Sequence, residues 1–212
     1  IGSLLMAVLF LGIGVVGVIL HSRWQPLPDA VTTDHPAPAD AAATFELTSP
    51  PLADVVRDIN KYSNNVMAQQ VFLTLGLVRN PSSGGTRSST PEDGREALRL
   101  WMRDRLGESL DGVVIDNGSG LSRETRISAA LLGRVLQRAW SSAVMPELVA
   151  SVPVTGLDGT RRRSRGNAAT TGRAHLKTGS LRDVQALAGY VLGASGKRYV
   201  LVAMINHANA SA

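Results

Sequence analysis

Residues 175–181 read His-Leu-Lys-Thr-Gly-Ser-Leu, and this stretch places one cation, two hydroxyls and a glycine at the start of a predicted β-strand. Lys177 is one of only three lysines in the chain, so the Lys-Thr-Gly triplet is not a by-product of a lysine-rich surface. An ammonium next to the Thr178 hydroxyl can bind a carboxylate. Gly179 leaves room for a ligand to approach the strand backbone. The stretch therefore predicts an anion-binding wall.

A second polar triplet, Ser63-Asn64-Asn65, interrupts a helical pattern far upstream. The spacing of the apolar residues predicts a helix that begins near residue 50 with Ser49 as its cap and ends at residues 61–64. A second helix is expected over residues 66–75, ending at Gly76. Ser63 and Asn65 would then lie at a rigid junction that presents side chains to a cleft.

The rest of the chain after residue 80 alternates loops and helices and then becomes β-structure. The expected elements are a polar loop at 80–94, a helix at 97–106, a short strand at 113–115, a glycine-rich turn at 116–123, a helix at 129–140 capped by Ser128, a helical turn from 146, and strands at 174–179, 184–193 and 198–206. The last two strands should form a hairpin. This pattern predicts an α/β (α+β) fold in which an antiparallel sheet is flanked by helices.

Composition restricts the kinds of chemistry that this chain can perform. The 212 residues are 44% hydrophobic and 18% charged, which is typical of a globular domain. There is no cysteine, which excludes disulfides and Cys-based zinc sites, and the four histidines lack metal-ligand spacing. We therefore expect no metal and no cofactor. The net charge of +5 comes from scattered arginines without interleaved aromatic residues, so no nucleic-acid partner is expected.

The first 44 residues differ from the remainder in composition. Residues 1–20 carry no charge and are followed by Arg23 and Trp24, so segment 1–24 is a candidate membrane anchor. Two alternatives stay open, a buried segment of the fold and a stretch foreign to the native reading frame. Residues 25–44 are rich in Pro, Ala, Thr and Asp and predict a linker. Residues 45–212 are expected to be the C-terminal part of a longer protein's globular domain.

Three stretches, residues 49–70, 118–123 and 172–181, resemble the D-Ala-D-Ala carboxypeptidase/endopeptidases, which are the low-molecular-mass class C penicillin-binding proteins. Ser-x-Asn followed by Lys-Thr-Gly is part of the motif set of penicillin-recognising serine enzymes. The resemblance implies a serine DD-peptidase (β-lactamase-like) fold, incomplete in this chain. It also implies an extracytoplasmic enzyme of the periplasm or cell envelope. Such an enzyme hydrolyses peptidoglycan stem peptides ending in D-Ala-D-Ala through an acyl-enzyme, and β-lactams inhibit it.

The same resemblance assigns roles to six residues. Ser63, Asn65 and Lys177 would be catalytic, with Ser63 relaying a proton. Thr178, Gly179 and Ser180 would bind the substrate, and the backbone N–H of Ser180 would form half of an oxyanion hole. No metal would take part.

The sequence departs from the family pattern at two points. Thr125 stands where the family usually has Asn, so a hydroxyl replaces an amide at that position. No serine is followed three residues later by lysine, so the Ser-x-x-Lys nucleophile motif is absent. A non-catalytic, membrane-anchored peptidoglycan-binding or interaction module is therefore an alternative function. A β-lactamase-type hydrolase is a third, which the peptidase-like flanks of the motifs disfavour.

Overall fold

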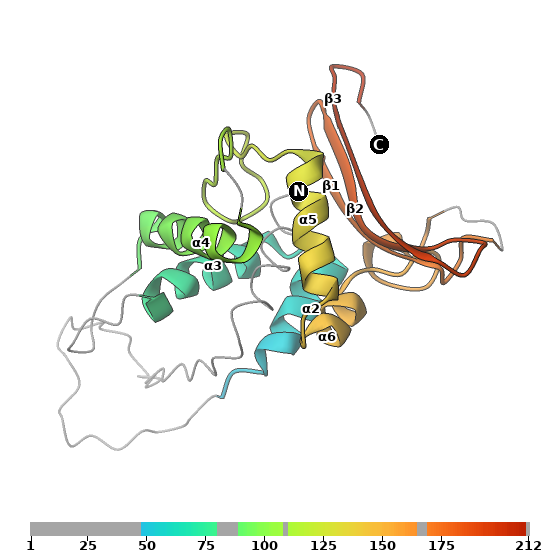
Figure 1. Ribbon diagram of the computed structural model, residues 1–212, viewed down its shortest axis with the longest axis horizontal. Helices are drawn as coiled ribbons and strands as arrows, with labels where there is room; N and C mark the ends of the chain where they lie inside the picture. Colours follow the sequence, from blue (N-terminus) through green and yellow to red (C-terminus); the bar gives the residue numbers. More distant parts are fainter. Residues whose placement is uncertain (1–47, 80–88, 108–109, 165–168, 211–212) are drawn as a thin grey trace, which may run out of the picture.

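The computed structural model describes residues 48–79, 89–107, 110–164 and 169–210 (Figure 1). The predicted anchor segment 1–24 and the predicted linker 25–44 lie outside the described residues. None of the helices in the described ranges is long and apolar enough to cross a bilayer.

A helical region and a three-stranded sheet make up the described chain (Figure 1). The helices are α2 (Leu52–Tyr62), α3 (Asn65–Arg79), α4 (Pro91–Leu106), α5 (Ala129–Trp140), α6 (Met145–Ser151) and the 3₁₀ turn η1 (Gly159–Arg161). The strands are β1 (Ala174–Leu181), β2 (Val184–Leu192) and β3 (Arg198–Asn206). They pair antiparallel in the order β1-β2-β3, which confirms the predicted α+β architecture.

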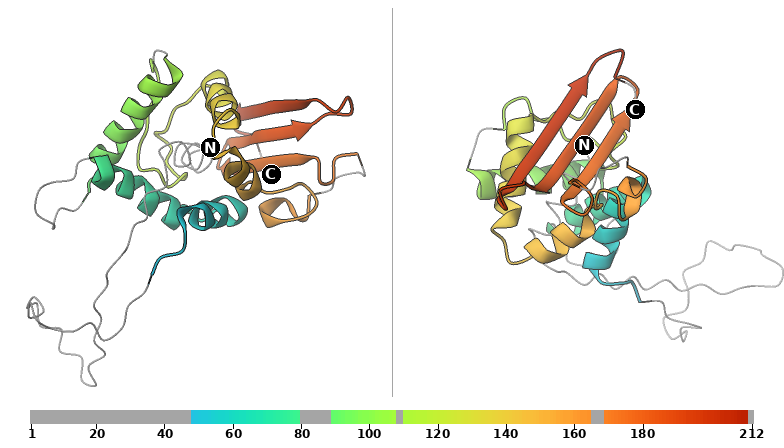
Figure 2. Two further views of the ribbon diagram at one scale, coloured as in Figure 1. Left: turned by 60° about the horizontal axis from the view of Figure 1, so that its bottom comes forward. Right: turned by 90° about the vertical axis from the view of Figure 1, so that its right-hand side faces the viewer.

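The sheet packs one face against the helices, as the alternation of its apolar residues predicts. Ala188 and Tyr190 of β2 are buried on this face, and the Tyr190 hydroxyl donates to the carbonyl of Leu136 in α5 at 2.8 Å. The other face is different, because Tyr199, Leu201 and Ile205 of β3 remain exposed. In Figure 2 (right) the strands lie in front and the helices behind them.

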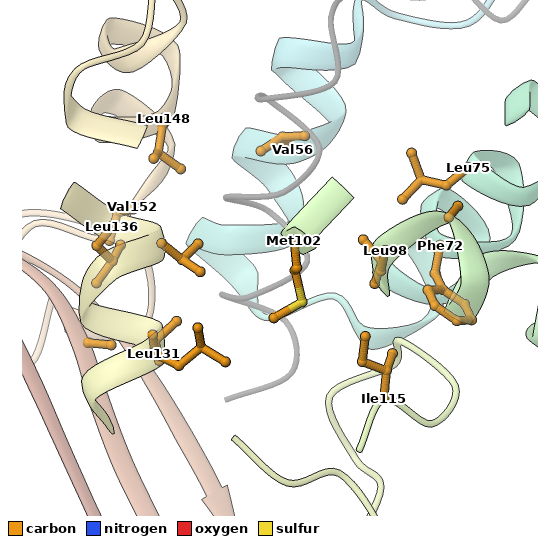
Figure 3. Close-up of a cluster of buried hydrophobic side chains, with 14 of the residues drawn as sticks. Val56, Phe72, Leu75, Leu98, Met102, Ile115, Leu131, Leu136, Leu148 and Val152 are labelled. Atoms are coloured by element: carbon orange, nitrogen blue, oxygen red, sulfur yellow. The ribbon is translucent and has the colours of Figure 1, made fainter. Parts of the chain in front are cut away.

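One core joins the two regions (Figure 3). Met102 of α4 lies between Phe72 and Leu98 on one side and Leu131 and Leu136 of α5 on the other. All five side chains are almost completely buried. The core thereby holds α5, which supports the sheet, in a fixed relation to α3, which begins at the helix junction.

Several predicted boundaries are wrong by a few residues. α2 begins after Pro51, whose side chain makes no capping hydrogen bond, and so Ser49 is not the cap. α2 also continues through Lys61 to Tyr62, which reduces the break to Ser63 and Asn64. The predicted strand at 113–115 is a single bridge between Val114 and Arg126. The Ser128 cap of α5 is confirmed, since its side chain accepts from the Leu131 N–H.

The predicted loop at 80–94 is too long, because α4 begins at Pro91. Thr90 and Asp93 form a reciprocal capping box in which each side chain accepts from the backbone N–H of the other. This local pair satisfies two backbone donors and starts the helix. Gly94 consequently lies inside α4, where a Cβ would meet the Phe72 ring at 2.8 Å.

Gly76 does not end α3, which continues to Arg79. A Cβ at this position would lie 2.3 Å from the Ser89 Oγ and 2.7 Å from the Asp93 Cβ. Gly76 is therefore required by the close contact between α3 and the start of α4, and not by a left-handed helix end.

We predict opposite effects for alanine at two helical glycines. Gly76→Ala should lower the free energy of unfolding, because overpacking costs roughly 1–3 kcal/mol. Gly133→Ala in α5 is the matched control, since a Cβ there would have nothing within 4 Å and alanine gains up to about 1 kcal/mol of helix propensity. Urea denaturation of both variants measures the difference. Equal stability of the two would show that α3 and α4 are not in close contact at Gly76.

Candidate active site

The helix junction holds Ser63 in a strained backbone conformation. Ser63 has φ 54° and ψ 45°, in the left-handed region, and its N–H bonds to the Ile59 carbonyl at the end of α2. The Asn64 side chain then accepts from the Met67 N–H at 3.1 Å and starts α3. Left-handed conformations of non-glycine residues cost energy and cluster at functional sites. The predicted junction is confirmed, with Ser63 at its turn.

Lys177 on β1 meets this turn. Its side-chain nitrogen donates to the Ser63 hydroxyl and, at 2.8 Å, to the Thr178 carbonyl. Lys177 is only 3% exposed. The structure therefore brings together two of the predicted catalytic residues, which are separated by 114 positions in the sequence.

Burial lowers the pKa of the Lys177 ammonium from 10.5 to about 8. Desolvation disfavours the charged form, and the contacts of Lys177 among the described residues are to a hydroxyl and a carbonyl, which do not neutralise it. At neutral pH most of the lysine is still protonated and can attract a carboxylate. A pKa so close to neutral also allows proton exchange with the Ser63 hydroxyl.

Among the described residues, β1 is an edge strand of the sheet, and some of its backbone groups face this edge beside Lys177. The first half of this edge is occupied, since the Leu176 N–H donates to the Pro153 carbonyl at 2.8 Å. Backbone direction alternates along a strand, so the N–H groups of Thr178 and Ser180 point to the same edge. The Ser180 side chain is engaged elsewhere, with Gln185 at 2.7 Å. What Ser180 presents to this edge is its backbone N–H.

The glycine-rich turn borders this end of β1. A cavity of about 420 Å³ lies between the turn and the strand, lined by Gly120, Arg123, Thr125, Gly179 and Ser180 among others. The Arg123 guanidinium donates to the Arg182 carbonyl at 3.0 Å and so connects the glycine-rich turn to the loop between β1 and β2. Thr125, the departure from the family pattern, is thus part of the wall of this cavity.

Asn65 is placed less directly than its predicted partners. It is the half-buried first residue of α3, two positions after Ser63. The contacts of the described residues do not join it to Lys177, and its catalytic role stays a prediction. In the same described ranges, no group of three His, Asp or Glu side chains is arranged to hold a metal ion.

Two residues near the site were missed from the sequence. Lys61 is buried and bonds to the Val152 carbonyl at 2.8 Å and to Asp158 at 2.6 Å. The scarcity of lysine, which singled out Lys177, could also have singled out Lys61. Nothing in the sequence pattern indicates Asp158, which lies 97 residues away.

Comparisons with known proteins identify the family that this chain resembles. The model of the D-Ala-D-Ala carboxypeptidase 3 (S13) family matches residues 16–212. A D-alanyl-D-alanine carboxypeptidase of Actinomadura sp. (strain R39) is 33% identical over 165 residues, covering 74% of this chain and 29% of the relative.

Solved structures of penicillin-binding and β-lactamase proteins have a similar fold. Penicillin binding protein 4 (dacB) from Haemophilus influenzae superposes with a TM-score of 0.66 and 25% identity, over 76% of this chain and 35% of that protein. A class A β-lactamase from Clostridium kluyveri, 13% identical, shares the fold with a TM-score of 0.54 over 99% of this chain and 76% of its own. The chain spans about a third of the length of the carboxypeptidase and of penicillin binding protein 4.

The buried lysine predicts a pH dependence of stability. The folded-state pKa of Lys177 lies below the unfolded value, so the unfolded chain binds more protons between pH 8 and 10.5. Stability attributable to Lys177 should therefore rise across this interval, by up to about 3 kcal/mol at roughly 1.4 kcal/mol per pKa unit. Denaturation of the wild type and Lys177→Met from pH 7 to 10.5 measures it.

The exposed hairpin residue Lys197 provides the control for this titration. Lys197→Met should follow the wild-type curve, whereas Lys177→Met should lack the rise. A Lys177→Met curve parallel to the wild type would mean that Lys177 is not desolvated.

Proposed function

The chain belongs to the D-Ala-D-Ala carboxypeptidase 3 (S13) family, and we propose that it supplies two walls of a serine D-Ala-D-Ala carboxypeptidase/endopeptidase active site. The observation that carries this proposal is the contact between the buried Lys177 and Ser63. The proposed substrates are peptidoglycan stem peptides ending in D-Ala-D-Ala, and the proposed inhibitors are β-lactams. Such substrates would place the protein outside the cytoplasm, in the periplasm or cell envelope.

The two walls are the Ser63–Asn65 helix junction and the Lys177–Ser180 part of β1, and each has a separate role in the proposed mechanism. The Lys177 ammonium attracts the terminal carboxylate of the substrate, and the Thr178 hydroxyl donates to it. Ser63, polarised by Lys177, passes a proton to the leaving amine. Asn65 holds a substrate peptide group through its amide. The Ser180 N–H stabilises the oxyanion, because a fixed donor aimed at developing negative charge lowers the barrier.

The acylated serine lies outside the two motifs of this chain. The 212 residues contain no Ser-x-x-Lys, so we assign the nucleophile and its base to polypeptide beyond them. Residues 1–24 stay a proposed membrane anchor. The missing motif also favours a second candidate function, a non-catalytic module that binds peptidoglycan peptides through the same carboxylate-binding wall.

Binding of a substrate mimic tests the carboxylate-binding wall that Lys177 and Thr178 form. In an NMR titration of this chain, diacetyl-L-Lys-D-Ala-D-Ala should shift the amide signals of Thr178 and Ser180 saturably. Lys177→Met should weaken binding at least about tenfold, since losing a charge-assisted bond costs roughly 1.5–3 kcal/mol. Lys197→Met is the charge-matched control and should bind as the wild type does. No binding by the wild type would contradict the proposed function.

Fluorescent penicillin distinguishes the two candidate functions. Intact mass should show no acyl adduct on this 212-residue chain. The protein isolated from its native source, with any flanking residues, should acquire one adduct if the peptidase assignment is right. An adduct on the 212-residue chain would contradict the assignment of the nucleophile. Absence of an adduct on the native protein, with the peptide still bound, would favour the binding module.

A further inference from the structure

Residues 152–161 form a bridging segment between the end of α2 and β1. On the α2 side, the buried Lys61 ammonium donates to the Val152 carbonyl at 2.8 Å and pairs with an Asp158 carboxylate oxygen, Oδ2, at 2.6 Å. The Lys61 side chain is only 11% exposed. Gly159 lies so close to the helix that a Cβ there would be 2.6 Å from the Lys61 carbonyl oxygen.

The same bridging segment pairs with β1. The Thr155 N–H donates to the Ala174 carbonyl at 2.9 Å, and Leu176 bonds back to the Pro153 carbonyl. The second oxygen of Asp158, Oδ1, accepts from the Val154 N–H at 2.7 Å. Val154 forms the bridge to His175. One carboxylate therefore binds the helix with one oxygen and the strand-pairing residue with the other.

These anchor points lie next to the two halves of the site. Lys61 is two residues before Ser63, and Leu176 directly precedes Lys177. We infer that Lys61 and Asp158 are positioning residues, which hold the Ser63 turn against the Lys177 strand through the bridging segment. The inference deepens the proposed function, because the contact that it explains is the one assigned to proton relay and carboxylate binding.

The electrostatics of the pair support a fixed geometry. Burial by itself would raise the pKa of Asp158, but the hydrogen bonds from Lys61 and from the Val154 N–H outweigh it and lower the pKa. Asp158 is therefore ionised at neutral pH. Removing Asp158 leaves the buried Lys61 ammonium without a counter-ion, which is unfavourable for that arrangement, whereas the Asp158 carboxylate is 44% exposed and keeps contact with water. The two contacts of Lys61 therefore favour one position of the end of α2 relative to the bridging segment.

The test measures Lys177 in variants that remove the pair. The chain has three lysines, so ¹³Cε-lysine labelling gives few signals, and the titration of Lys177 can be followed directly. Both Lys61→Met and Asp158→Asn should loosen the Ser63 turn and admit water to Lys177. Its pKa should then rise from about 8 towards 10.5, by at least one unit, which is roughly a tenfold gain in proton affinity.

Simple charge effects make a different prediction. Removing the Lys61 cation would raise the pKa of Lys177, whereas removing the Asp158 anion would lower it. Positioning predicts a rise in both variants. The exposed Arg57–Asp54 pair on the same helix is the matched control, and Arg57→Met and Asp54→Asn should leave Lys177 unchanged. Lys61→Arg, which keeps a donor and its charge, should restore most of the wild-type value.

Two further variants keep the inference testable if Lys61→Met does not fold. Asp158→Glu preserves the charge and displaces the carboxylate, and Lys61→Met/Asp158→Leu removes both charges together. An unchanged Lys177 pKa in every folded variant would overturn the inference.

Affinity for diacetyl-L-Lys-D-Ala-D-Ala separates this inference from the proposed function. In Asp158→Asn, affinity should fall about tenfold, or roughly 1.4 kcal/mol, because the loosened Ser63 turn no longer holds the Lys177 ammonium in place for the carboxylate. If the wild type does not bind the peptide, the proposed function fails, and the Lys177 titration still decides the positioning role. If affinity is unchanged although the pKa rises, the pair positions Lys177 without serving the substrate.

Discussion

The desolvation of a single ammonium group constrains the rest of this structure. The buried Lys177 lies on β1 against the Ser63 turn between α2 and α3, and it has no ion-pair partner among its described contacts. A buried charge without a counter-ion is unfavourable unless polar groups are held in place around it. The left-handed turn at Ser63 and the Thr178 carbonyl are such groups. Both must be placed by elements that the core and the bridging segment make rigid.

The two buried lysines of the described region differ in their partners. Lys61 is neutralised by Asp158 and bonded to a carbonyl, as expected of a structural ion pair. The Lys177 nitrogen is bonded to uncharged oxygens among the described residues, and burial lowers its pKa. Perturbed groups of the second kind gather at functional sites. The contrast between an ion-paired and an unpaired buried lysine supports Lys177 as the residue reserved for an incoming anion.

Local patterns predicted most of the fold, and long-range contacts explain the rest. The alternation in 184–193 and 198–206 and the Ser128 cap depend on neighbouring residues, so the sequence was sufficient there. Gly76 was misread because its reason lies in Ser89 and Asp93, across a helix contact. Lys61 and Asp158 were missed because their pairing spans 97 positions. Ser63 and Lys177 were proposed through family motifs, since no periodicity relates a helix junction to a distant strand.

The outer face of the sheet has a consequence for handling the isolated chain. Tyr199, Leu201 and Ile205 of β3 are exposed on one face, while the opposite face is packed on α5. The strand is thus apolar on both faces, and it carries no charge between Arg198 and Asn206 to discourage pairing with another strand. Among the described residues, β3 is therefore the strand with the features that favour self-association, and β2 separates it from the strand that carries Lys177. Self-association there should increase with protein concentration and with kosmotropic salts such as sulfate, because these salts strengthen apolar burial.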